Sequence, residues 1–508
     1  MVVAQGSNRL GRWGLWAVAA VGLAIRSRQF LSGRSLWLDE AMVANDLRER
    51  TIVGLVSSES PREQMAPPGF WVVEKAASIA SHSAASLRFF PFVGGVLLLA
   101  LAVIFAQHHL RHWPARILLV ATISFSPALV HYSTELKPYV VEAAASMLLM
   151  LAVARRRQWS VAALTAIGVG AILFSFPALV FVPLLGVAFG LELASSEGWS
   201  RAIERLWRPA IVLSAAEALV GISALSTRAP IDDFWHEADG YAPAPWSGGF
   251  GWLAETAART ARFSLYHVGI IGRPADDSLD NAVWASTAAL LVALVLLAGI
   301  LTARRWLRSG LDDTGRSFVL MGGTIAVAFA VMVTLSGLEL YPLQGRLTIY
   351  LFPLVFLAAA ASVDYLMEQR AAPIVAALAL VVALAPIPRA TDVAVSPYDR
   401  YDIVEALSWI EGSPQPGDAI VFDLGTSGEA FAFHSPDFDF GATPIRHYSK
   451  LDADGIAPLA DGHTVWYFSA FVTARNSAWV EQLVLDELVV DHWRGDGAVA
   501  IEIHPMGG

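Results

Sequence analysis

The chain has 508 residues, of which 55% are hydrophobic and only 16% are charged, and its net charge is −10. Soluble globular domains carry about 25% charged residues, so this composition excludes an ordinary soluble protein. The acidic balance argues against nucleic acid as a partner, and the absence of cysteine excludes disulfides and thiolate metal sites.

The hydrophobic stretches predict an α-helical polytopic membrane protein with about eleven transmembrane helices, each of about 20 mostly apolar residues. The first stretch follows Arg9 and Arg12, and no small-residue cleavage site stands out after it, so we expect a retained span. Ser175-Phe176-Pro177 joins the fifth and sixth spans, which are alternatively one broken helix. The expected spans are 13–31, 88–107, 115–131, 138–154, 160–174, 177–193, 209–226, 282–302, 317–337, 346–366 and 371–388.

The distribution of basic residues between the spans predicts how the helical bundle is oriented in the membrane. With a cytoplasmic N-terminus, the inner segments hold 15 Lys and Arg in 60 residues, and the outer loops hold 13 in 134. This asymmetry follows the positive-inside rule. We therefore expect a multi-pass protein of the inner (plasma) membrane, with the loops 32–87 and 227–281 and the C-terminal domain on the extracytoplasmic side.

The first outer loop opens with Trp37-Leu38-Asp39-Glu40, which places two adjacent carboxylates just beyond a span. Such charges are costly near lipid unless they are solvated or paired. One interpretation is structural: Asp39 caps a helix whose dipole both acids complement. The other is catalytic: one carboxylate takes the proton from an acceptor hydroxyl as a general base. The pattern alone leaves both open.

Prolines in the same loop mark a further helix. Pro67-Pro68 ends one helix and starts the next. The segment 70–81 is short and carries Glu74 and Lys75, so we expect it to lie on the membrane surface rather than to cross it.

The short outer loop 131–138 contains Glu135 and Lys137, and Tyr139 follows it. Lys137 is the one basic residue of that loop. A lone lysine at a span end often extends to the interface. Alternatively its ammonium group binds a lipid phosphate, with Glu135 and Tyr139 orienting it.

Arg346 opens the tenth expected span, after Tyr341-Pro342 and Gly345. A guanidinium group there either holds a phosphate bidentately or anchors the helix end at the interface. In the loop 227–281, His236 lies near several acids, but no ligand spacing is diagnostic. We predict no metal site and no other cofactor.

From Pro397 the composition changes to that of a small soluble α/β domain, residues 397–508. Periodicity predicts helices at 402–411 and 476–488 and strands at 419–424, 464–470 and 499–504. No Gly-x-Gly-x-x-Gly motif supports dinucleotide binding. We expect a scaffold or a lid on the acceptor side, with direct ligand contact as the alternative.

Together these motifs resemble the polytopic GT-C glycosyltransferases, specifically the bacterial glycosyltransferase family 39 group. That group is similar to protein O-mannosyltransferases and to the lipid A aminoarabinose transferase. The motifs occur in family order over about residues 10–365. They are Trp37-Leu38-Asp39-Glu40, Pro67-Pro68, Leu87-Arg88, Glu135-Leu136-Lys137-Pro138-Tyr139, and Tyr341-Pro342 with Gly345-Arg346.

The resemblance implies a transmembrane glycosyltransferase domain over residues 1–390 that uses a polyprenyl-phosphate sugar donor. The acceptor would be a hydroxyl of a lipid, glycan or protein on the outer face of the membrane. The resemblance also implies a single displacement with inversion at the anomeric carbon. The phosphate leaving group is already anionic at pH 7, so it needs charge stabilisation more than a proton.

The same resemblance assigns roles to individual residues. Asp39 would be the catalytic base, supported by Glu40. Lys137 and Arg346 would hold the donor phosphate. Glu135 would position Lys137, and Tyr139 would complete the phosphate site.

Two rival readings remain. A transporter or lipid flippase would use Asp39, Glu142 and Glu217 for proton or substrate movement, since acids within spans are functional candidates. Either Glu142 or Glu217 is equally able to pair within the bundle. A flippase is expected to have broken helices and charges deep in several spans. Most charges here lie at span ends, which favours the enzyme over a transporter. A non-catalytic scaffold or sensor would leave Asp39, Lys137 and Arg346 without a shared purpose.

Overall fold

The computed structural model describes most of the chain: residues 2–228, 241, 313–343, 345–368, 372–397, 401–423, 426–447, 461–470, 489–495 and 497–504. The expected span 282–302, nearly all of the loop 227–281 with His236, and the expected helix 476–488 lie outside these residues.

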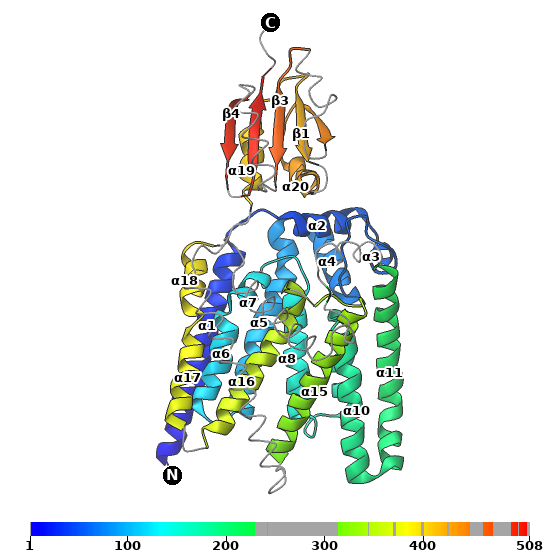
Figure 1. Cartoon of the computed structure of the whole chain (residues 1–508), viewed down its shortest axis with the longest axis vertical. Coiled ribbons are helices and arrows are strands. Elements are labelled where there is room, and N and C mark those ends of the chain that lie inside the picture. Colours follow the sequence, from blue (N-terminus) through cyan, green and yellow to red (C-terminus); the bar gives the residue numbers. More distant parts are fainter. Residues whose placement is uncertain are drawn as a thin grey trace. The chain divides into compact units, whose positions relative to one another are not determined.

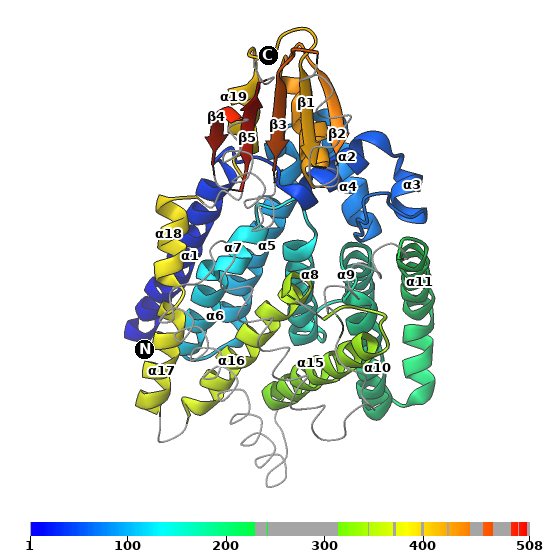
Figure 2. The same cartoon turned by 45° about the horizontal axis from the view of Figure 1, so that its top comes forward.

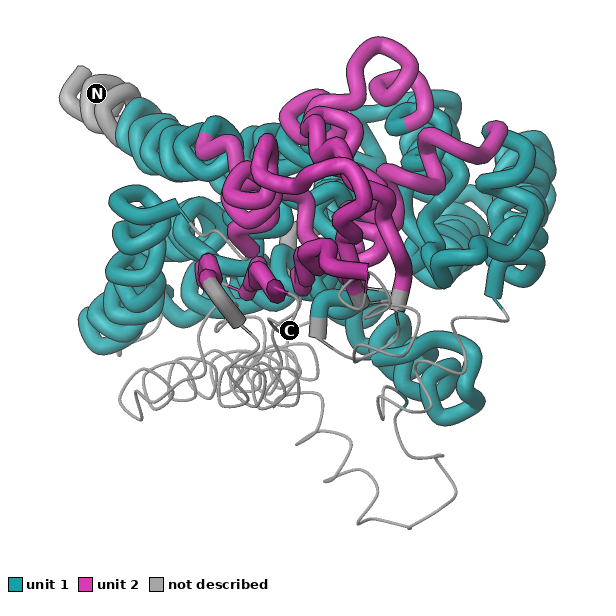
Figure 3. The backbone as a smooth tube through the Cα atoms, turned by 90° about the horizontal axis from the view of Figure 1, so that it is seen from above, with its two compact units in different colours: residues 1–31, 52–74, 88–397 teal, residues 32–51, 75–87, 398–508 magenta. Residues whose placement is uncertain are grey.

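The chain forms two compact units, shown in teal and magenta in Figure 3. Unit 1 comprises Met1–Leu31, Ile52–Glu74 and Arg88–Pro397, and unit 2 comprises Ser32–Thr51, Lys75–Leu87 and Tyr398–Gly508. The change in composition near residue 397 coincides with a boundary between the units, but two segments of the loop 32–87 group with the C-terminal part of the chain.

Unit 1 is helical throughout its described residues (Figure 1). The helices are α1 (Val2–Phe30), α3 (Ile52–Ser57), α4 (Pro68–Ala80), α5 (Ala84–His109), α6 (Trp113–Phe125), α7 (Pro127–Tyr132), α8 (Tyr139–Arg155), α9 (Val161–Phe174), α10 (Ala178–Glu197), α11 (Trp199–Ser226), α15 (Asp313–Gly337), the 3-10 helix η2 (Gly345–Leu351), α16 (Phe352–Leu366), α17 (Ala372–Leu384) and α18 (Ile387–Val395). The last residues of α4 and the first of α5 belong to unit 2.

Six helical segments among the described residues are long and apolar enough to cross a membrane. They are Ala84–His109, Ala178–Glu197, Trp199–Ser226, Val319–Gly337, Arg346–Leu366 and Ala372–Val395. The expected spans 115–131, 138–154 and 160–174 correspond to the shorter helices α6, α8 and α9. The expected helical fold with several candidate membrane spans is therefore present, whereas the count of about eleven spans is not confirmed.

Two local expectations of helix boundaries are confirmed. The segment around Ser175-Phe176-Pro177 separates α9 from α10, so these are two helices rather than one broken helix. Pro68 opens α4, as its fixed φ favours at a first helical position. The expectation that these prolines also end the preceding helix is wrong, because α3 already ends at Ser57. α4 is not among the six apolar helices of membrane-crossing length.

The interior of unit 1 is built around α6, which packs against α1, α16 and α17 (Figures 1 and 2). α1 and α6 approach closely at Gly22. A Cβ atom at Gly22 would lie 2.7 Å from Ser124 Cβ and 3.1 Å from the Ser124 carbonyl oxygen. Small residues permit such backbone approach between membrane helices.

Gly22→Ala is expected to destabilise the bundle by about 1–3 kcal/mol, because the added methyl meets backbone atoms that cannot rotate away. Thermal unfolding of the purified protein in detergent measures this effect. Gly221→Ala is the matched control, since a Cβ there has no neighbour within 4 Å. Equal unfolding temperatures for the two variants would contradict the close approach.

The C-terminal part of unit 2 is a five-stranded sheet in the order β2-β1-β3-β5-β4. The strands are β1 (Ala419–Asp423), β2 (Thr443–His447), β3 (Val465–Ser469), β4 (Val489–Arg494) and β5 (Val499–Ile503). β2, β1 and β3 are parallel, and β5 runs antiparallel to its neighbours β3 and β4. Figure 2 shows the sheet with its helix α19.

Helices α19 (Ile403–Ile410) and α20 (Thr426–His434) pack on this sheet. The expected apolar face of α19 is confirmed: Ile403, Leu407 and Ile410 are buried with Phe422 and Phe468 of the sheet. The helix expected at 402–411 and the strands expected at 419–424, 464–470 and 499–504 are therefore present. α20, β2, β4 and the short 3-10 turn η3 (Ser435–Asp437) are additional elements.

Candidate functional site

The loop between α7 and α8 holds Lys137 in a buried position. Its side chain is only 6% exposed, and its Nζ donates to Gln64 Oε1 at 2.5 Å. The Lys137 backbone N–H donates to the Glu135 carbonyl at 2.7 Å, which makes the turn tight. The Glu135 carboxylate lies 2.9 Å from His131 Nε2. Tyr139 then begins α8, and its ring packs edge-on against Tyr132. The structure thus brings Glu135, Lys137 and Tyr139 together.

Arg26 of α1 holds the loop between α7 and α8 through Ser133. The sequence patterns did not indicate this role. The residue is fully buried, and its Nε donates to Ser133 Oγ at 3.1 Å. Its two terminal nitrogens donate to the carbonyls of Ser124 and Ile123, each at 2.8 Å. All of these acceptors are neutral. An arginine within an otherwise apolar stretch is the signal that would have revealed it.

A buried polar cluster lies at the start of α8. The Phe176 N–H donates to Glu142 Oε1 at 3.1 Å, so Glu142 closes the turn between α9 and α10. Among the described residues, the Tyr350 hydroxyl is buried without a hydrogen-bond partner. Burial, together with Glu142, Tyr350 and Tyr139, raises the pKa of Tyr341 well above its usual value. Tyr341 therefore stays protonated throughout the physiological range.

Arg346 is half-buried in η2, the element that precedes α16. η2 packs against α8 within unit 1. Arg346 therefore lies on an element that packs against α8, the helix that follows the Lys137 turn. The Tyr341 hydroxyl donates to the Leu347 carbonyl at 3.2 Å, which links the preceding turn to η2.

Asp39 and Glu40 belong to unit 2, in the first turn of α2 (Leu38–Glu49). Asp39 is 8% exposed and Glu40 is fully buried. The backbone N–H of Trp37 donates to Glu40 Oε2 at 3.4 Å, so Glu40 supplies the side-chain contact that closes the helix start. At the other end of α2, the Lys75 ammonium donates to the Leu47 carbonyl, as a cation at a helix C-terminus favours.

Glu74 of α4 is a buried acid outside the six apolar helices. Among the described residues, neither of its carboxylate oxygens has a hydrogen-bond partner. Burial raises the pKa of Glu74 to about 9, so the group is neutral at pH 7. It packs as a protonated acid in the fold and ionises when the chain unfolds.

This raised pKa makes the stability of the folded protein depend on pH. The contribution of Glu74 to the free energy of unfolding is fully present below the usual glutamate pKa of about 4.5 and is lost as the pH rises to about 9. Glu74→Gln keeps the shape of the protonated side chain but has no group that ionises in this range. The variant is therefore expected to lose less stability between pH 5 and pH 9 than the unmodified protein. Unfolding temperatures in detergent across this range test it, and parallel curves for the two proteins would contradict it.

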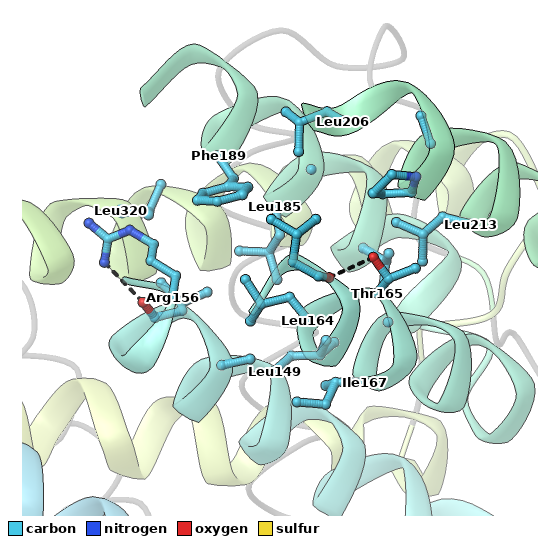
Figure 4. Close-up of a pocket in the computed structure, with 18 residues that line it drawn as sticks. Leu149, Arg156, Leu164, Thr165, Ile167, Leu185, Phe189, Leu206, Leu213 and Leu320 are labelled. Atoms are coloured by element: carbon cyan, nitrogen blue, oxygen red, sulfur yellow. Dashed lines mark hydrogen bonds between the residues drawn. The ribbon is translucent and has the colours of Figure 1, made fainter. Parts of the chain in front are cut away.

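An apolar cavity of about 190 Å³ lies among α8, α9, α10 and α11 (Figure 4). The residues that line it are mainly aliphatic, such as Leu164 and Leu185, and include the aromatic Phe189. The Arg156 guanidinium at one end is satisfied: it donates to Glu192 at 2.6 and 3.0 Å and to the Val153 carbonyl. The cavity therefore suits hydrocarbon rather than a sugar, and none of the predicted site residues lines it.

In the part of the chain that the structure describes, no group of three or more His, Cys, Asp or Glu residues is arranged to hold a metal ion. His236 lies outside that part. The predicted absence of a metal or other cofactor remains a prediction.

No family model and no curated protein sequence matches this chain. Among solved structures, the chain is similar to ArnT from Cupriavidus metallidurans in the apo state, with 14% identity and a TM-score of 0.37 over 98% of each chain. It is also similar to ArnT from the same organism bound to undecaprenyl phosphate, with 14% identity and a TM-score of 0.38 over 96% of this chain and 97% of that one. At 14% identity, these similarities concern the fold alone.

Proposed function

We propose that this protein transfers a sugar from a polyprenyl-phosphate donor to an acceptor hydroxyl on the outer face of the inner membrane. The N-terminus would be cytoplasmic, as the basic residues favour. The observation that carries the proposal is the buried Lys137 ammonium group, placed two residues before the first residue of α8.

This position suits a phosphate for two reasons. An ammonium group removed from water interacts with an anion more strongly than an exposed one does. The N-terminus of α8 adds the partial positive charge of the helix dipole. Arg346, on the element packed against α8, supplies a second cation for the same anion. Glu135 and Tyr139 hold the Lys137 turn in place.

The acceptor side needs a base, and we assign this role to Asp39. Glu40 provides the contact that closes the start of α2, so helix capping does not require Asp39. In the proposed step, Asp39 takes the hydroxyl proton while the hydroxyl oxygen bonds to the anomeric carbon. The bond from that carbon to the phosphate oxygen breaks, and the phosphate keeps the electron pair. A single displacement of this kind inverts the anomeric configuration.

The rival transporter reading depends on acids within the bundle. Glu142 accepts a hydrogen bond from the Phe176 N–H at a helix-to-helix turn, which is a structural role. This weakens the case that Glu142 moves protons or substrate. Glu217, on α11, remains without an assigned role.

Mass spectrometry of polyprenyl-linked sugars tests the proposed function. A deletion strain is expected to accumulate one polyprenyl-phosphate sugar, which names the donor. Liposomes that contain the purified protein, supplied with a native membrane extract as the source of acceptor, should then convert that lipid to polyprenyl phosphate. An unchanged lipid profile, together with no release of polyprenyl phosphate, would reject the enzyme. Movement of the intact lipid across the bilayer would favour the flippase.

A further inference from the structure

Helix α2, which carries Asp39, is attached to the C-terminal α/β domain within unit 2. The side-chain amide of Asn45 donates to the Glu429 carbonyl at 3.0 Å and to Glu429 Oε2 at 2.7 Å. Asn45 is buried, and α2 packs along α20. One amide group therefore binds both the backbone and the side chain of a single residue, which fixes the position and the rotation of α2 on α20.

The segment that leads into α2 is attached to the same domain. The Val404 N–H, at the start of α19, donates to Ser35 Oγ at 3.1 Å. His434 Nε2, at the end of α20, lies 3.4 Å from the Leu36 carbonyl oxygen. The Trp37 ring stacks on Tyr401, with ring centres 6.4 Å apart. These contacts hold the three residues that precede α2, and the last of them, Trp37, lies two residues before Asp39.

The attachment point is the part of an α/β sheet where ligands usually bind. α20 follows β1 at the carboxyl end of the parallel strands, and β1 lies between β2 and β3, where the strand order changes direction. Ser427 at this point accepts a hydrogen bond from the Ala470 N–H, which follows β3. Glu429 lies in the first turn of α20. The domain thus uses the end of the sheet that is best suited to recognition to hold a helix of its own chain.

We infer that the C-terminal domain orients the catalytic base, and that Asn45 and Glu429 are positioning residues for it. This inference rests on the proposed function, in which Asp39 is the base. Asp39 lies six residues before Asn45 on one rigid helix, about 9 Å along its axis. A rotation of α2 at Asn45 therefore displaces the Asp39 carboxylate, and a misplacement of about 1 Å costs about 100-fold in rate.

The first test measures release of polyprenyl phosphate, using a native membrane lipid extract as the source of donor and acceptor. This product is the same whichever sugar is transferred. Asn45→Ala and Glu429→Ala are each expected to lower the maximal rate about 10- to 100-fold, since they release α2. The amount of extract that gives half the maximal rate should not change, because the donor phosphate contacts are intact. Glu405→Ala, an exposed glutamate of α19 in the same domain, is the matched control.

The second test reverses the hydrogen bond. Asn45→Asp places a carboxylate against that of Glu429 and is expected to be slower than Asn45→Ala. The double variant Asn45→Asp with Glu429→Gln restores a donor and an acceptor in opposite order, so it should recover part of the lost rate. A general loss of folding would not be rescued in this way, and failure of the double variant to exceed Asn45→Asp would overturn the inference.

The third test does not depend on activity. The chain has no cysteine, so Asn45→Cys with Glu429→Cys gives a protein with two thiols. A short thiol cross-linker should join them in native membranes, and should fail when one cysteine is moved to exposed Glu405. Absence of the Asn45–Glu429 cross-link rejects the docking. If the link forms but Asp39→Asn retains full activity, the proposed base is wrong. If Asp39→Asn is inactive while Asn45→Ala and Glu429→Ala are fully active, the positioning role is wrong and the base stands.

Discussion

Asp39→Asn is expected to lower the rate of sugar transfer about 100- to 10,000-fold, the range usually lost with a general base. The amide has nearly the same shape as the carboxylate but does not accept the hydroxyl proton. α2 should still form, because Glu40 closes its first turn and Asn45 holds it on α20. Release of polyprenyl phosphate from the native lipid extract measures the loss.

Glu49→Gln is the matched control for this change. It neutralises an exposed acid at the other end of the same helix. The control should transfer sugar at the normal rate, and both variants should unfold at the temperature of the unmodified protein. Binding of undecaprenyl phosphate should also be unchanged in Asp39→Asn, since the base does not contact the leaving group. Full transfer activity in Asp39→Asn would reject the base assignment.

Lys137→Met is expected to weaken binding of undecaprenyl phosphate about 10- to 100-fold. The methionine keeps most of the volume of the buried side chain and removes its charge. A hydrogen bond to a charged group contributes about 1.5–3 kcal/mol, which corresponds to this loss. Titration of the purified protein in detergent with undecaprenyl phosphate measures the affinity directly, without the sugar being known.

Two further lysine variants separate charge from general damage. Lys137→Arg keeps the positive charge and is expected to retain more affinity than Lys137→Met, although its planar group fits the Gln64 contact less well. Lys75→Met removes the lysine that contacts the end of α2 and should leave phosphate affinity unchanged. If Lys137→Met binds undecaprenyl phosphate normally, the lysine is not a phosphate ligand.

The features that the sequence predicts well depend on local pattern. The start of α4 follows from Pro67-Pro68, the separation of α9 and α10 from Phe176-Pro177, and the buried face of α19 from its helical periodicity. The resemblance names Lys137, which is buried, as are Glu135 and Tyr139 on either side of it in the sequence.

The features that the sequence does not predict depend on contacts between residues far apart in the chain. Arg26 is recognisable as important only when its acceptors in α6 and at Ser133 are known. The sequence gives Asp39 two readings, a helix cap or a base, but the side chain that closes the helix is Glu40. The partnership of α2 with α20 joins residues 384 positions apart, and no local pattern encodes such a pair.

That separation sets an order of events during synthesis. Ribosomes add about 5–20 residues per second, so roughly 20–80 s pass between the synthesis of Asn45 and that of its hydrogen-bond partner Glu429. Until then, α2 has been made and carries Asp39, but its place on the α/β domain is missing. A chain that stops between Arg346 and Glu429 therefore contains every predicted phosphate ligand and still lacks the contact that holds the proposed base. If Asp39 is the base, we expect sugar transfer to begin only after the C-terminal domain has been made and has bound α2.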